Sequence, residues 1–382
     1  MWKLQENVLD YTDKKALVDF VHNTDRFTQF NKVKLFEQKW SEWQGCKHSV
    51  FVNSGSSADL IMLDAVKELN DIPDNSEVLV PAVTWATNIT SVIQSKLTPV
   101  FVDINLYDLS FSYEDIEKHI TKNTSIILVT HLLGIPDNLD ILRSIAQKHN
   151  LILLEDCCEA HGAVFNDRKV GNFGLASTFS FYWGHHITTI EGGMVCTDNE
   201  DLYDLLLLKR SHGLARELDV SKHDEYKKQF PSIDFNFLFL THGYNVRNTE
   251  LHATIGIAQL ERIDDFIRIR NENYNEFIAI ISEMEETMYV PAFFGVSSFC
   301  LPLIFRSKFD KDYIVKKLHK AEIETRPIVG GNLLKQPCFK QYSKGDYSAA
   351  QIVHNNGLYV GNNQFVDKDR IHLLKCILHG KG

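Results

Sequence analysis

The hydrophobic pattern of the first 200 residues alternates between short apolar runs and stretches with helical spacing. Several runs are apolar throughout, as expected of strands buried on both faces of a helix-covered sheet. Helical patterns at residues 57–69 and 138–150 lie between some of these runs. The alternation predicts a mainly parallel, seven-stranded sheet in a three-layer α/β sandwich. The predicted strands are residues 48–53, 77–81, 99–103, 125–130, 151–156, 177–181 and 193–197.

From about residue 246 the alternation gives way to a long helical pattern at residues 249–282, which has room for an interruption. Because the chain exceeds the usual size of one domain, we expect two. Residues 1–245 would form a large domain with an N-terminal helical segment. Residues 246–382 would form a smaller C-terminal α+β domain that includes a long connecting helix. The later elements are an apolar run at 297–305 and helices at 311–323 and 368–378.

Composition excludes several classes of function. The chain has 382 residues and a net charge of −10, which argues against nucleic-acid binding because nothing offsets phosphate repulsion over a broad face. No run reaches the roughly 20 apolar residues that span a bilayer. The first residues lack an apolar signal region, so we expect the protein to remain in the cytoplasm.

The cysteines are scattered, odd in number and mostly placed in apolar runs. No pair has the C-x2-C spacing, which weighs against structural zinc and against a cysteine-ligated iron–sulfur cluster. We therefore expect reduced thiols, mostly in the core, without redox chemistry. The seven are Cys46, Cys157, Cys158, Cys196, Cys300, Cys338 and Cys376.

Unusual polar residues follow the predicted strands, and ligands of open α/β sheets bind outside the carboxyl ends of the strands. The first run ends in "NSGSSADL", a glycine and three serines before a helix. Backbone N–H groups at a helix N-terminus, together with hydroxyl groups, suit a phosphate. The alternative is a simple helix cap, formed by Ser56 or Ser57 with Gly55 in a turn.

The second run places Trp85 at its end, where an indole could pack in the core, act as a lid or stack on a planar ligand. His131 follows the fourth run. The fifth run ends in "LLEDCCEAHG", and a carboxylate at the end of a buried strand is costly unless it is paired. A cationic cofactor nitrogen would pair it, and so would a nearby arginine or a helix cap. The polar residues of this segment are Glu155, Asp156, Glu159 and His161.

Two adjacent histidines, His185 and His186, follow the sixth run and Ser180 in "FSFYWGHHITTIEGGM". They suggest a metal site, a buried structural pair or a catalytic base. If the segment is extended, the two side chains point in opposite directions, so a shared metal is disfavoured and His186 points elsewhere. A phosphate cradle, an aromatic plate, a strand-end carboxylate and a base, in this order, together describe a site for pyridoxal phosphate (PLP).

Several motifs carry a resemblance that runs from about residue 25 to 375. They are "NSGSSA", "PAVTWAT", "THLLG", "LLEDCCEAHGA", "FSF…ITTIEGGM", "RSHG" and "GYNVRNTELHATIGIAQL". In these motifs the chain resembles the fold-type I, aspartate-aminotransferase-like PLP enzymes that act on nucleotide-linked keto sugars. The resemblance implies that the large domain binds the cofactor and that the active site is shared within a homodimer.

The resemblance also assigns roles to residues. Ser56, Ser57 and Ser180 would hold the cofactor phosphate. Trp85 would stack on the pyridine ring, and Asp156 would pair with its protonated nitrogen. The contact across the dimer would come from one further residue, Asn245, which would reach the phosphate in the neighbouring subunit.

The chain departs from the aminotransferase pattern "FSF…K.ITTGEGG" at three positions. His185 stands where those enzymes have the lysine that binds the cofactor, Ile190 replaces a glycine, and Glu159 stands where a glutamine is usual. Histidine forms no stable imine but can move protons near neutral pH. This change is typical of the branch of 3-dehydratases that act on GDP-4-keto-6-deoxy-D-mannose, and residues 323–332 and 360–365 also resemble that branch. Iron–sulfur 3-dehydratases share the histidine, but the clustered cysteines that they need are missing.

That branch implies a reaction. L-Glutamate would convert PLP to pyridoxamine phosphate, and His185 would act as the base while the C3 hydroxyl of the 4-keto sugar leaves. The products would be ammonia and a 3-deoxy-4-keto sugar, in a colitose-type deoxysugar pathway. Glu159 would orient His185 or contact the cofactor's phenolic oxygen. Arg326 would contact the substrate, and His212 would either do the same or be purely structural.

Two alternatives stay open at this stage. The first is a GDP-sugar 4-aminotransferase of the perosamine type in which the lysine has been changed. The second is a non-catalytic protein that retains the cofactor. The intact phosphate cradle, the strand-end Asp156 and a replacement base argue against the second.

Overall fold

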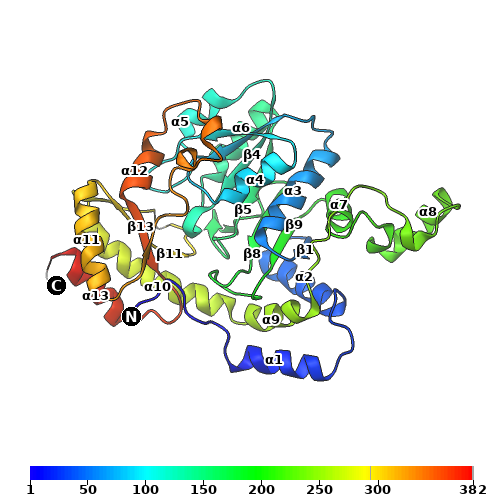
Figure 1. Ribbon diagram of the computed structural model, residues 1–382, viewed down its shortest axis with the longest axis horizontal. Helices are drawn as coiled ribbons and strands as arrows, with labels where there is room; N and C mark the ends of the chain where they lie inside the picture. Colours follow the sequence, from blue (N-terminus) through cyan, green and yellow to red (C-terminus); the bar gives the residue numbers. More distant parts are fainter. Residues whose placement is uncertain (293, 381–382) are drawn as a thin grey trace.

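The computed structural model describes residues 1–292 and 294–380 (Figure 1). Its largest sheet has seven strands in the order β1-β9-β8-β5-β4-β2-β3. Six strands run in the same direction, whereas β9 is antiparallel to both of its neighbours, β1 and β8. The strands are β1 (His48–Val52), β2 (Glu77–Pro81), β3 (Thr98–Val102), β4 (Thr124–Thr130), β5 (Ile152–Asp156), β8 (Ala176–Ser180) and β9 (Gly193–Thr197).

These are the seven strands that the sequence predicts, and each boundary lies within one residue of its predicted position. Alternate residues enter different cores: Val50 and Val52 of β1 lie in one apolar cluster and Phe51 in the other. Helices supply the opposite walls of both clusters, so the three-layer prediction is confirmed. One layer contains α3 (Gly55–Leu69), α4 (Ala86–Gln94) and α7 (Glu200–Arg210), and the other contains α2 (Asn31–Gln44), α6 (Leu139–His149) and α9 (Glu250–Leu260).

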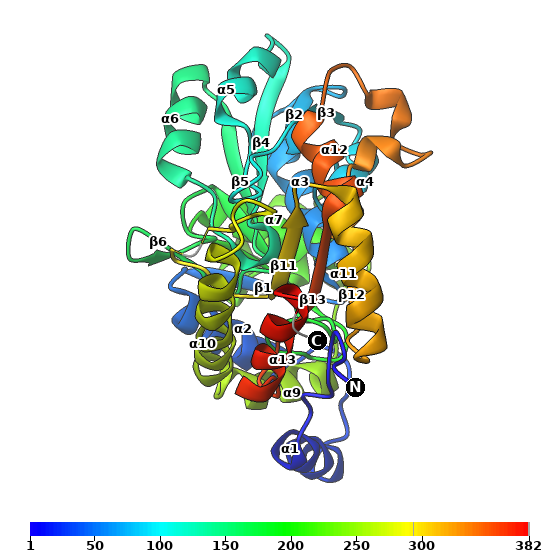
Figure 2. The same ribbon diagram turned by 90° about the vertical axis from the view of Figure 1, so that its left-hand side faces the viewer.

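A second, four-stranded antiparallel sheet, in the order β10-β11-β13-β12, lies in the C-terminal part of the chain (Figure 2). Trp2 forms a bridge to Ile323 beside this sheet, and its indole N–H donates to the Gly361 carbonyl at 3.0 Å. The N-terminal residues therefore pack against the C-terminal sheet. The boundary at residue 245 stays a prediction. The elements are β10 (Met288–Tyr289), β11 (Cys300–Phe305), β12 (Thr325–Arg326), β13 (Gly357–Gly361), α11 (Lys308–Lys320), α12 (Ser348–Asn356) and α13 (Lys368–Leu378).

The predicted long helix is two helices, α9 and α10 (Ile263–Ser282), separated at residues 261–262. The helix predicted at 311–323 is α11, which begins three residues earlier because the Ser307 hydroxyl accepts the Phe309 N–H at 3.1 Å and caps it. The remaining elements are α1 (Tyr11–His22), α5 (Tyr113–Ile116), α8 (Val220–Gln229), β6 (Val164–Phe165), β7 (Arg168–Lys169) and 3-10 turns at Glu117–His119, Leu132–Gly134, Ala215–Glu217, Phe235–Phe237, Leu333–Lys335 and Lys340–Tyr342.

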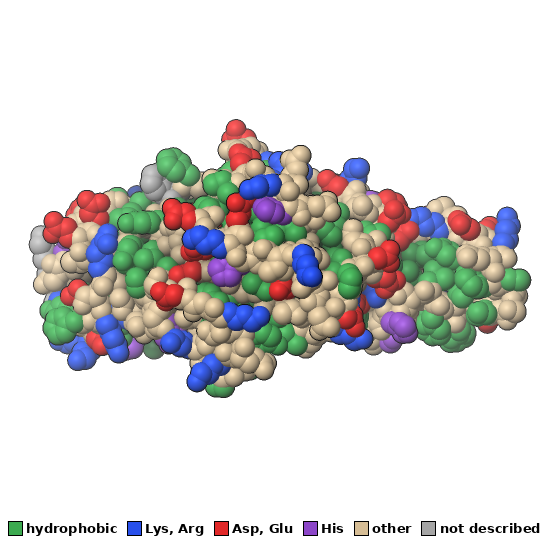
Figure 3. All heavy atoms as spheres, turned by 90° about the horizontal axis from the view of Figure 1, so that it is seen from above, with side chains coloured by type: hydrophobic (Ala, Val, Ile, Leu, Met, Phe, Trp, Pro, Cys, Tyr) green, Lys and Arg blue, Asp and Glu red, His purple; other side chains and the backbone are tan. Residues whose placement is uncertain are grey.

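A projecting arm around α8 extends from the body at the right of Figure 1. Val220, Phe237 and Phe239 of this arm expose more than half of their surface. Figure 3 shows hydrophobic side chains gathered over this end, whereas acidic and basic side chains are interspersed over the body. Within the described residues, no helix is both long and apolar enough to cross a membrane.

All seven cysteines are free thiols. Cys157, Cys196 and Cys300 are buried, whereas the others are partly or fully exposed. The prediction that most cysteines lie in the core is therefore wrong. The reason is local, since Cys46 follows the end of α2 and Cys338 lies in a loop, where apolar neighbours do not imply burial.

Candidate active site

The first strand end leads into the N-terminus of α3. Ser54, in an extended conformation, caps this helix, because its hydroxyl oxygen accepts the Ser57 N–H at 3.1 Å. The prediction that Ser56 or Ser57 is the cap is therefore wrong. The helix begins at Gly55, so the hydroxyl that accepts the N–H of its third residue belongs to Ser54. This leaves the Ser56 side chain exposed and that of Ser57 partly exposed at a helix N-terminus.

Gly55 and Ser180 bring this helix end against the end of β8. A Cβ atom on Gly55 would lie 2.7 Å from the Ser180 Cβ and 3.2 Å from the Cys158 Sγ, so no other residue fits there without displacement. Ser180 is buried at the last position of β8, and its hydroxyl accepts the Tyr182 N–H at 3.3 Å. Backbone N–H groups and three serine hydroxyls therefore converge where sequence reasoning places a phosphate.

Trp85 is the residue before α4, beyond the carboxyl end of β2. Its indole is 52% exposed, although the flanking residues Val83 and Ile89 are buried. An exposed indole at this edge of the sheet is free to stack on a planar ligand.

Asp156 is the last residue of β5, and it is 3% exposed. Its carboxylate accepts the Asn88 side-chain N–H at 2.7 Å and the Cys158 backbone N–H at 2.8 Å. Among the described residues, no lysine, arginine or histidine forms an ion pair with it. A buried carboxylate that only neutral donors satisfy suits a cation supplied by a ligand.

A second buried carboxyl group, Asp59 on α3, lies beside Asp156, and sequence reasoning missed it. Asp59 accepts the Thr178 hydroxyl at 2.7 Å, and the Asn88 side-chain nitrogen lies 3.5 Å from its other oxygen. Burial, together with the negative charge of Asp156, holds the pKa of Asp59 well above its usual range. One available signal was a single charged residue in the otherwise uncharged first two turns of α3.

The two histidines lie in a turn segment between β8 and β9 rather than in a strand. The extended conformation on which their opposite directions depended is therefore absent, and both rings pack near His161, with centroid separations of 5.9 and 5.2 Å. The Nε2 atom of His186 lies 3.0 Å from the Ser297 hydroxyl, which gives His186 a structural role.

His185 is partly exposed, and its Nδ1 atom is buried without a hydrogen-bond partner. Burial and the charge of Arg270 lower the pKa of His185 to about 3. The imidazole is therefore neutral over the physiological pH range, with a free lone pair on one nitrogen. A side chain in this state can accept a proton.

Ile190, in the same segment, has a φ of 73° and is 43% exposed. This left-handed conformation is unfavourable for a β-branched residue and natural for glycine. The sequence departure from glycine at this position therefore introduces backbone strain next to His185.

Glu159 and Arg326 lie near one another on the other side of Asp156. The Glu159 carboxylate accepts the Leu133 N–H at 2.8 Å, and in the described part of the chain no hydrogen bond joins it to His185. Burial and the charge of Asp156 raise the pKa of Glu159 to about 7, against the Leu133 hydrogen bond and the positive charge of Arg326, which lower it. Arg326 is exposed on β12 and therefore accessible to a substrate.

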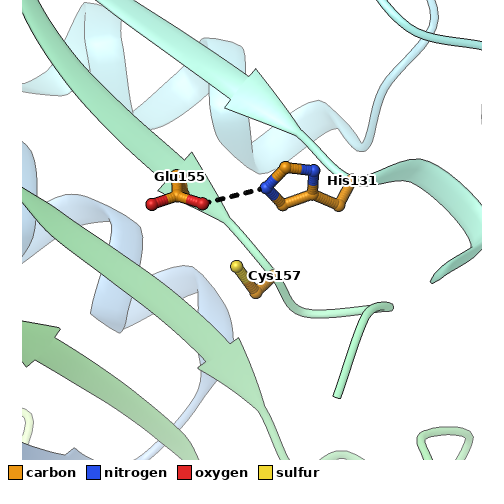
Figure 4. Close-up of side chains that lie close together, drawn as sticks. All are labelled: His131, Glu155 and Cys157. Carbon is orange, nitrogen blue, oxygen red and sulfur yellow. Dashed lines mark hydrogen bonds and ion pairs between the residues drawn. The ribbon is translucent and has the colours of Figure 1, made fainter. Parts of the chain in front are cut away.

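His131, Glu155 and Cys157 are the group in the described residues whose ligand atoms lie close enough to hold a metal ion (Figure 4). However, the nitrogen atoms of His131 and the oxygen atoms of Glu155 already form hydrogen bonds within the protein. The His131 Nε2 lies 3.1 Å from a Glu155 oxygen, and its Nδ1 accepts the Asp137 N–H at 3.1 Å. Glu155 also accepts three backbone N–H groups, and burial raises the pKa of the Cys157 thiol. The group is a structural network that fixes the end of β5.

Asn245 and His212 lie in the segment that leads to and from the arm. Asn245 lines a cavity of about 1050 Å³ with Arg247, whose Nε donates to the Asn245 amide oxygen at 3.1 Å. The lining of this cavity includes none of the strand-end residues described above. His212 is exposed, with a φ of 63°, and its backbone N–H donates to the Tyr244 carbonyl at 2.6 Å.

The arrangement fits PLP. The close approach of Gly55 to Ser180 leaves hydroxyl and N–H groups for a phosphate, and Asp156 is a buried carboxylate without a cationic partner in the described residues. An exposed indole and a neutral imidazole complete the donor set. Sequence reasoning identified these residues but missed Asp59, Ser54 and Arg270.

Comparison with known proteins agrees with this geometry. Residues 10–371 match the DegT/DnrJ/EryC1/StrS aminotransferase family. The GDP-4-keto-6-deoxy-D-mannose 3-dehydratase of Yersinia pseudotuberculosis is 36% identical, over 96% of each chain. A crystal structure of GDP-4-keto-6-deoxymannose-3-dehydratase with a trapped PLP–glutamate geminal diamine has a TM-score of 0.91 and 34% identity, over 99% of this chain and 100% of that one. A variant of such an enzyme with bound GDP-perosamine has a TM-score of 0.92 and 34% identity, with the same coverage.

Proposed function

The chain belongs to the DegT/DnrJ/EryC1/StrS aminotransferase family, and from this membership we propose that it is a PLP-dependent lyase that removes the C3 hydroxyl of GDP-4-keto-6-deoxy-D-mannose. L-Glutamate is the amino donor, and the products are ammonia, 2-oxoglutarate and a 3-deoxy-4-keto sugar. The observation that carries the proposal is the neutral, partly exposed His185 at the position where aminotransferases have lysine.

Ser56, Ser57 and Ser180, with the N-terminus of α3, bind the cofactor phosphate. Trp85 stacks on the ring. Asp156 keeps a proton on the ring nitrogen, because an unpaired buried carboxylate favours a neighbouring cation. Bound as the amine, the cofactor supplies a nucleophile for the C4 ketone and a pyridinium that accepts electrons when the C3–O bond breaks.

His185 takes a proton at Nε2, because its Nδ1 is buried, and delivers it elsewhere in the same site. The phosphate groups of cofactor and nucleotide bring negative charge into the site, which raises the pKa of this imidazole toward the working pH. Histidine cannot hold the cofactor covalently, so the amine form stays free to react with a sugar ketone. A lysine here would favour release of a stable amino sugar.

We assign Glu159 and Arg326 to the substrate side of the site, since the two lie close enough for the charge of Arg326 to act on Glu159. Arg326 is exposed and binds the sugar or its diphosphate, since a guanidinium matches phosphate geometry. Glu159 is held by the Leu133 N–H and contacts the cofactor's phenolic oxygen rather than His185. His212 is exposed and close to the arm, and we assign it to the nucleotide end of the substrate.

The protein acts as a homodimer in which Asn245 reaches the cofactor phosphate of the partner. Two features support this: Asn245 is exposed on a cavity that lacks the strand-end residues, and the arm presents exposed Val220, Phe237 and Phe239. Large exposed apolar side chains on a projecting segment favour association with another chain.

Ammonia release tests the function. The purified protein is incubated with PLP, L-glutamate and GDP-4-keto-6-deoxy-D-mannose, and free ammonia and 2-oxoglutarate are measured. Equal amounts of both, dependent on all three additions, support the dehydratase. 2-Oxoglutarate without ammonia supports a GDP-sugar 4-aminotransferase, and neither product in PLP-binding protein supports a non-catalytic role. The same assay with a dTDP-linked sugar measures the preference for the nucleotide.

A further inference from the structure

Arg270 of α10 is completely buried, and no carboxylate in the described residues forms an ion pair with it. Its guanidinium instead donates to three backbone carbonyls: Phe299 at 3.0 Å, His185 at 3.4 Å, and Asn362. An arginine buried without a counter-ion is costly, because the charge loses its hydration. Its placement therefore needs an explanation.

The three acceptors come from three separate segments. His185 lies in the loop after β8, Phe299 precedes β11, and Asn362 follows β13. Asn362 is fixed in turn, since its side-chain nitrogen donates to the Arg270 carbonyl and to the Ser298 hydroxyl, both at 2.9 Å. Arg270 thus connects the loop of the proposed base to the C-terminal sheet.

The surroundings of His185 make the charge of Arg270 effective. The His185 ring is faced by Tyr182 of its own loop, by His161 after β5, and by the apolar ring of Phe299, 5.5 Å away. No carboxylate in the described residues contributes to the protonation state of His185, so Arg270 acts without opposition. Burial disfavours the imidazolium form of His185 most, and the charge of Arg270, whose guanidinium lies 3.4 Å from the His185 carbonyl, adds to this effect.

We propose that Arg270 is a positioning residue for His185: it fixes the backbone of the base through the carbonyl, and its charge keeps the imidazole unprotonated. The inference rests on the proposed function for its meaning in catalysis. The charge of Arg270 and its hydrogen bond to the His185 carbonyl are present in the protein without substrate. Burial also lowers the pKa of Arg270 to about 10, which still leaves it charged at neutral pH.

The test is an NMR titration of the full-length protein labelled in its histidine imidazoles, without substrate, with the His185 signal assigned from a His185→Gln variant. Arg270→Met should raise the protonated fraction of His185 at a given acidic pH about tenfold, which is one pKa unit. Arg270→Lys keeps the charge and should leave this fraction near that of the wild type. The matched control is Arg268→Met, two residues away on α10, where the arginine is exposed and paired with Glu272.

An unchanged His185 titration in folded Arg270→Met, or an equal shift in Arg268→Met, would overturn the proposal. If Arg270→Met does not fold, Arg270→Lys decides, because a single ammonium nitrogen does not reproduce the two guanidinium nitrogens, one of which donates to Phe299 and Asn362 and the other to His185. In Arg270→Met or Arg270→Lys, amide hydrogen exchange that becomes faster only in the His185 loop supports the role of the Arg270 hydrogen bond to the His185 carbonyl. Unchanged protection of that loop contradicts it. These readouts need no turnover, so failure of the proposed reaction would be seen separately in the ammonia assay.

Discussion

Replacing Glu155 by glutamine tests whether the buried network at the end of β5 is structural. One Glu155 oxygen accepts the His131 ring N–H at 3.1 Å and the Gly171 N–H at 2.7 Å. The other accepts the N–H groups of Phe173 and Gly174 at 2.7 and 2.6 Å. Glutamine replaces one of these oxygens by an NH2 group. Because each oxygen accepts two N–H groups, the NH2 group faces two N–H donors in either orientation of the amide.

The cost follows from this count. A buried donor left without an acceptor costs about 1–3 kcal/mol, and losing a hydrogen bond to a charged group costs about 1.5–3 kcal/mol. Because the four donors belong to one network, these values do not add in full, and Glu155→Gln should destabilise the protein by about 3–5 kcal/mol. Asp156, the next residue, should then be less well placed, and PLP should bind more weakly.

Urea unfolding followed by circular dichroism measures the change as a lower midpoint at unchanged slope. Glu117→Gln, an exposed glutamate that pairs with Lys148, is the matched control and should leave the midpoint nearly unchanged. A loss below about 1 kcal/mol for Glu155→Gln would refute the account, because that value is typical of an ordinary surface change. A midpoint that falls on addition of a chelator would instead indicate a bound metal at this group.

The stability difference between the wild type and Glu155→Gln should also depend on pH. Burial alone would raise the pKa of Glu155, but the His131 hydrogen bond and the backbone N–H groups outweigh it and lower that pKa. A carboxyl group with a depressed folded pKa stabilises the fold above its unfolded pKa of about 4.3, and this contribution is lost as the pH falls further. The stability gap between wild type and Glu155→Gln should therefore narrow below about pH 4.

Four further substitutions test the site. His185→Lys should give a borohydride-reducible bond to PLP and lose dehydration, and an unchanged rate without that bond would contradict the assignment of the base. Asp156→Asn should weaken PLP binding and lower turnover at least tenfold, which spectrophotometric titration and the ammonia assay measure; full activity would remove its role. Asn245→Ala should weaken PLP binding in the dimer, with unchanged affinity counting against the contact across subunits. Ile190→Gly should relieve the left-handed backbone and stabilise the protein by about 1 kcal/mol in urea, whereas a loss would show that the strain is absent.

The strands and their polar ends were predictable because both signals are local. Four consecutive apolar residues and the carboxylates that follow them place β5 and its terminal Asp156, and "STFSF" places Ser180 in the same way. The lysine position at His185 follows from the family pattern around it. Each of these inferences needs only neighbouring residues.

The missed features depend on contacts between distant segments. Asp59 lies beside Asp156 because α3 packs on β8. The contact joins Asp59 to Thr178 of β8, which is 119 residues away along the chain. Arg270 lies in "RIRNEN", whose alternating charges indicate a solvated helix face, and only the fold shows that one of its two arginines is buried. The turn at His185 and His186 replaces the extended conformation that would have separated their rings.

Mass spectrometry of the nucleotide sugar tests the central claim most directly. The protein is incubated with PLP, L-glutamate and GDP-4-keto-6-deoxy-D-mannose, and the sugar product is compared with the substrate. The proposed reaction predicts a GDP-linked ketone that is one oxygen atom lighter than the substrate and contains no nitrogen from glutamate. A GDP-linked 4-amino sugar that retains the C3 oxygen would contradict it.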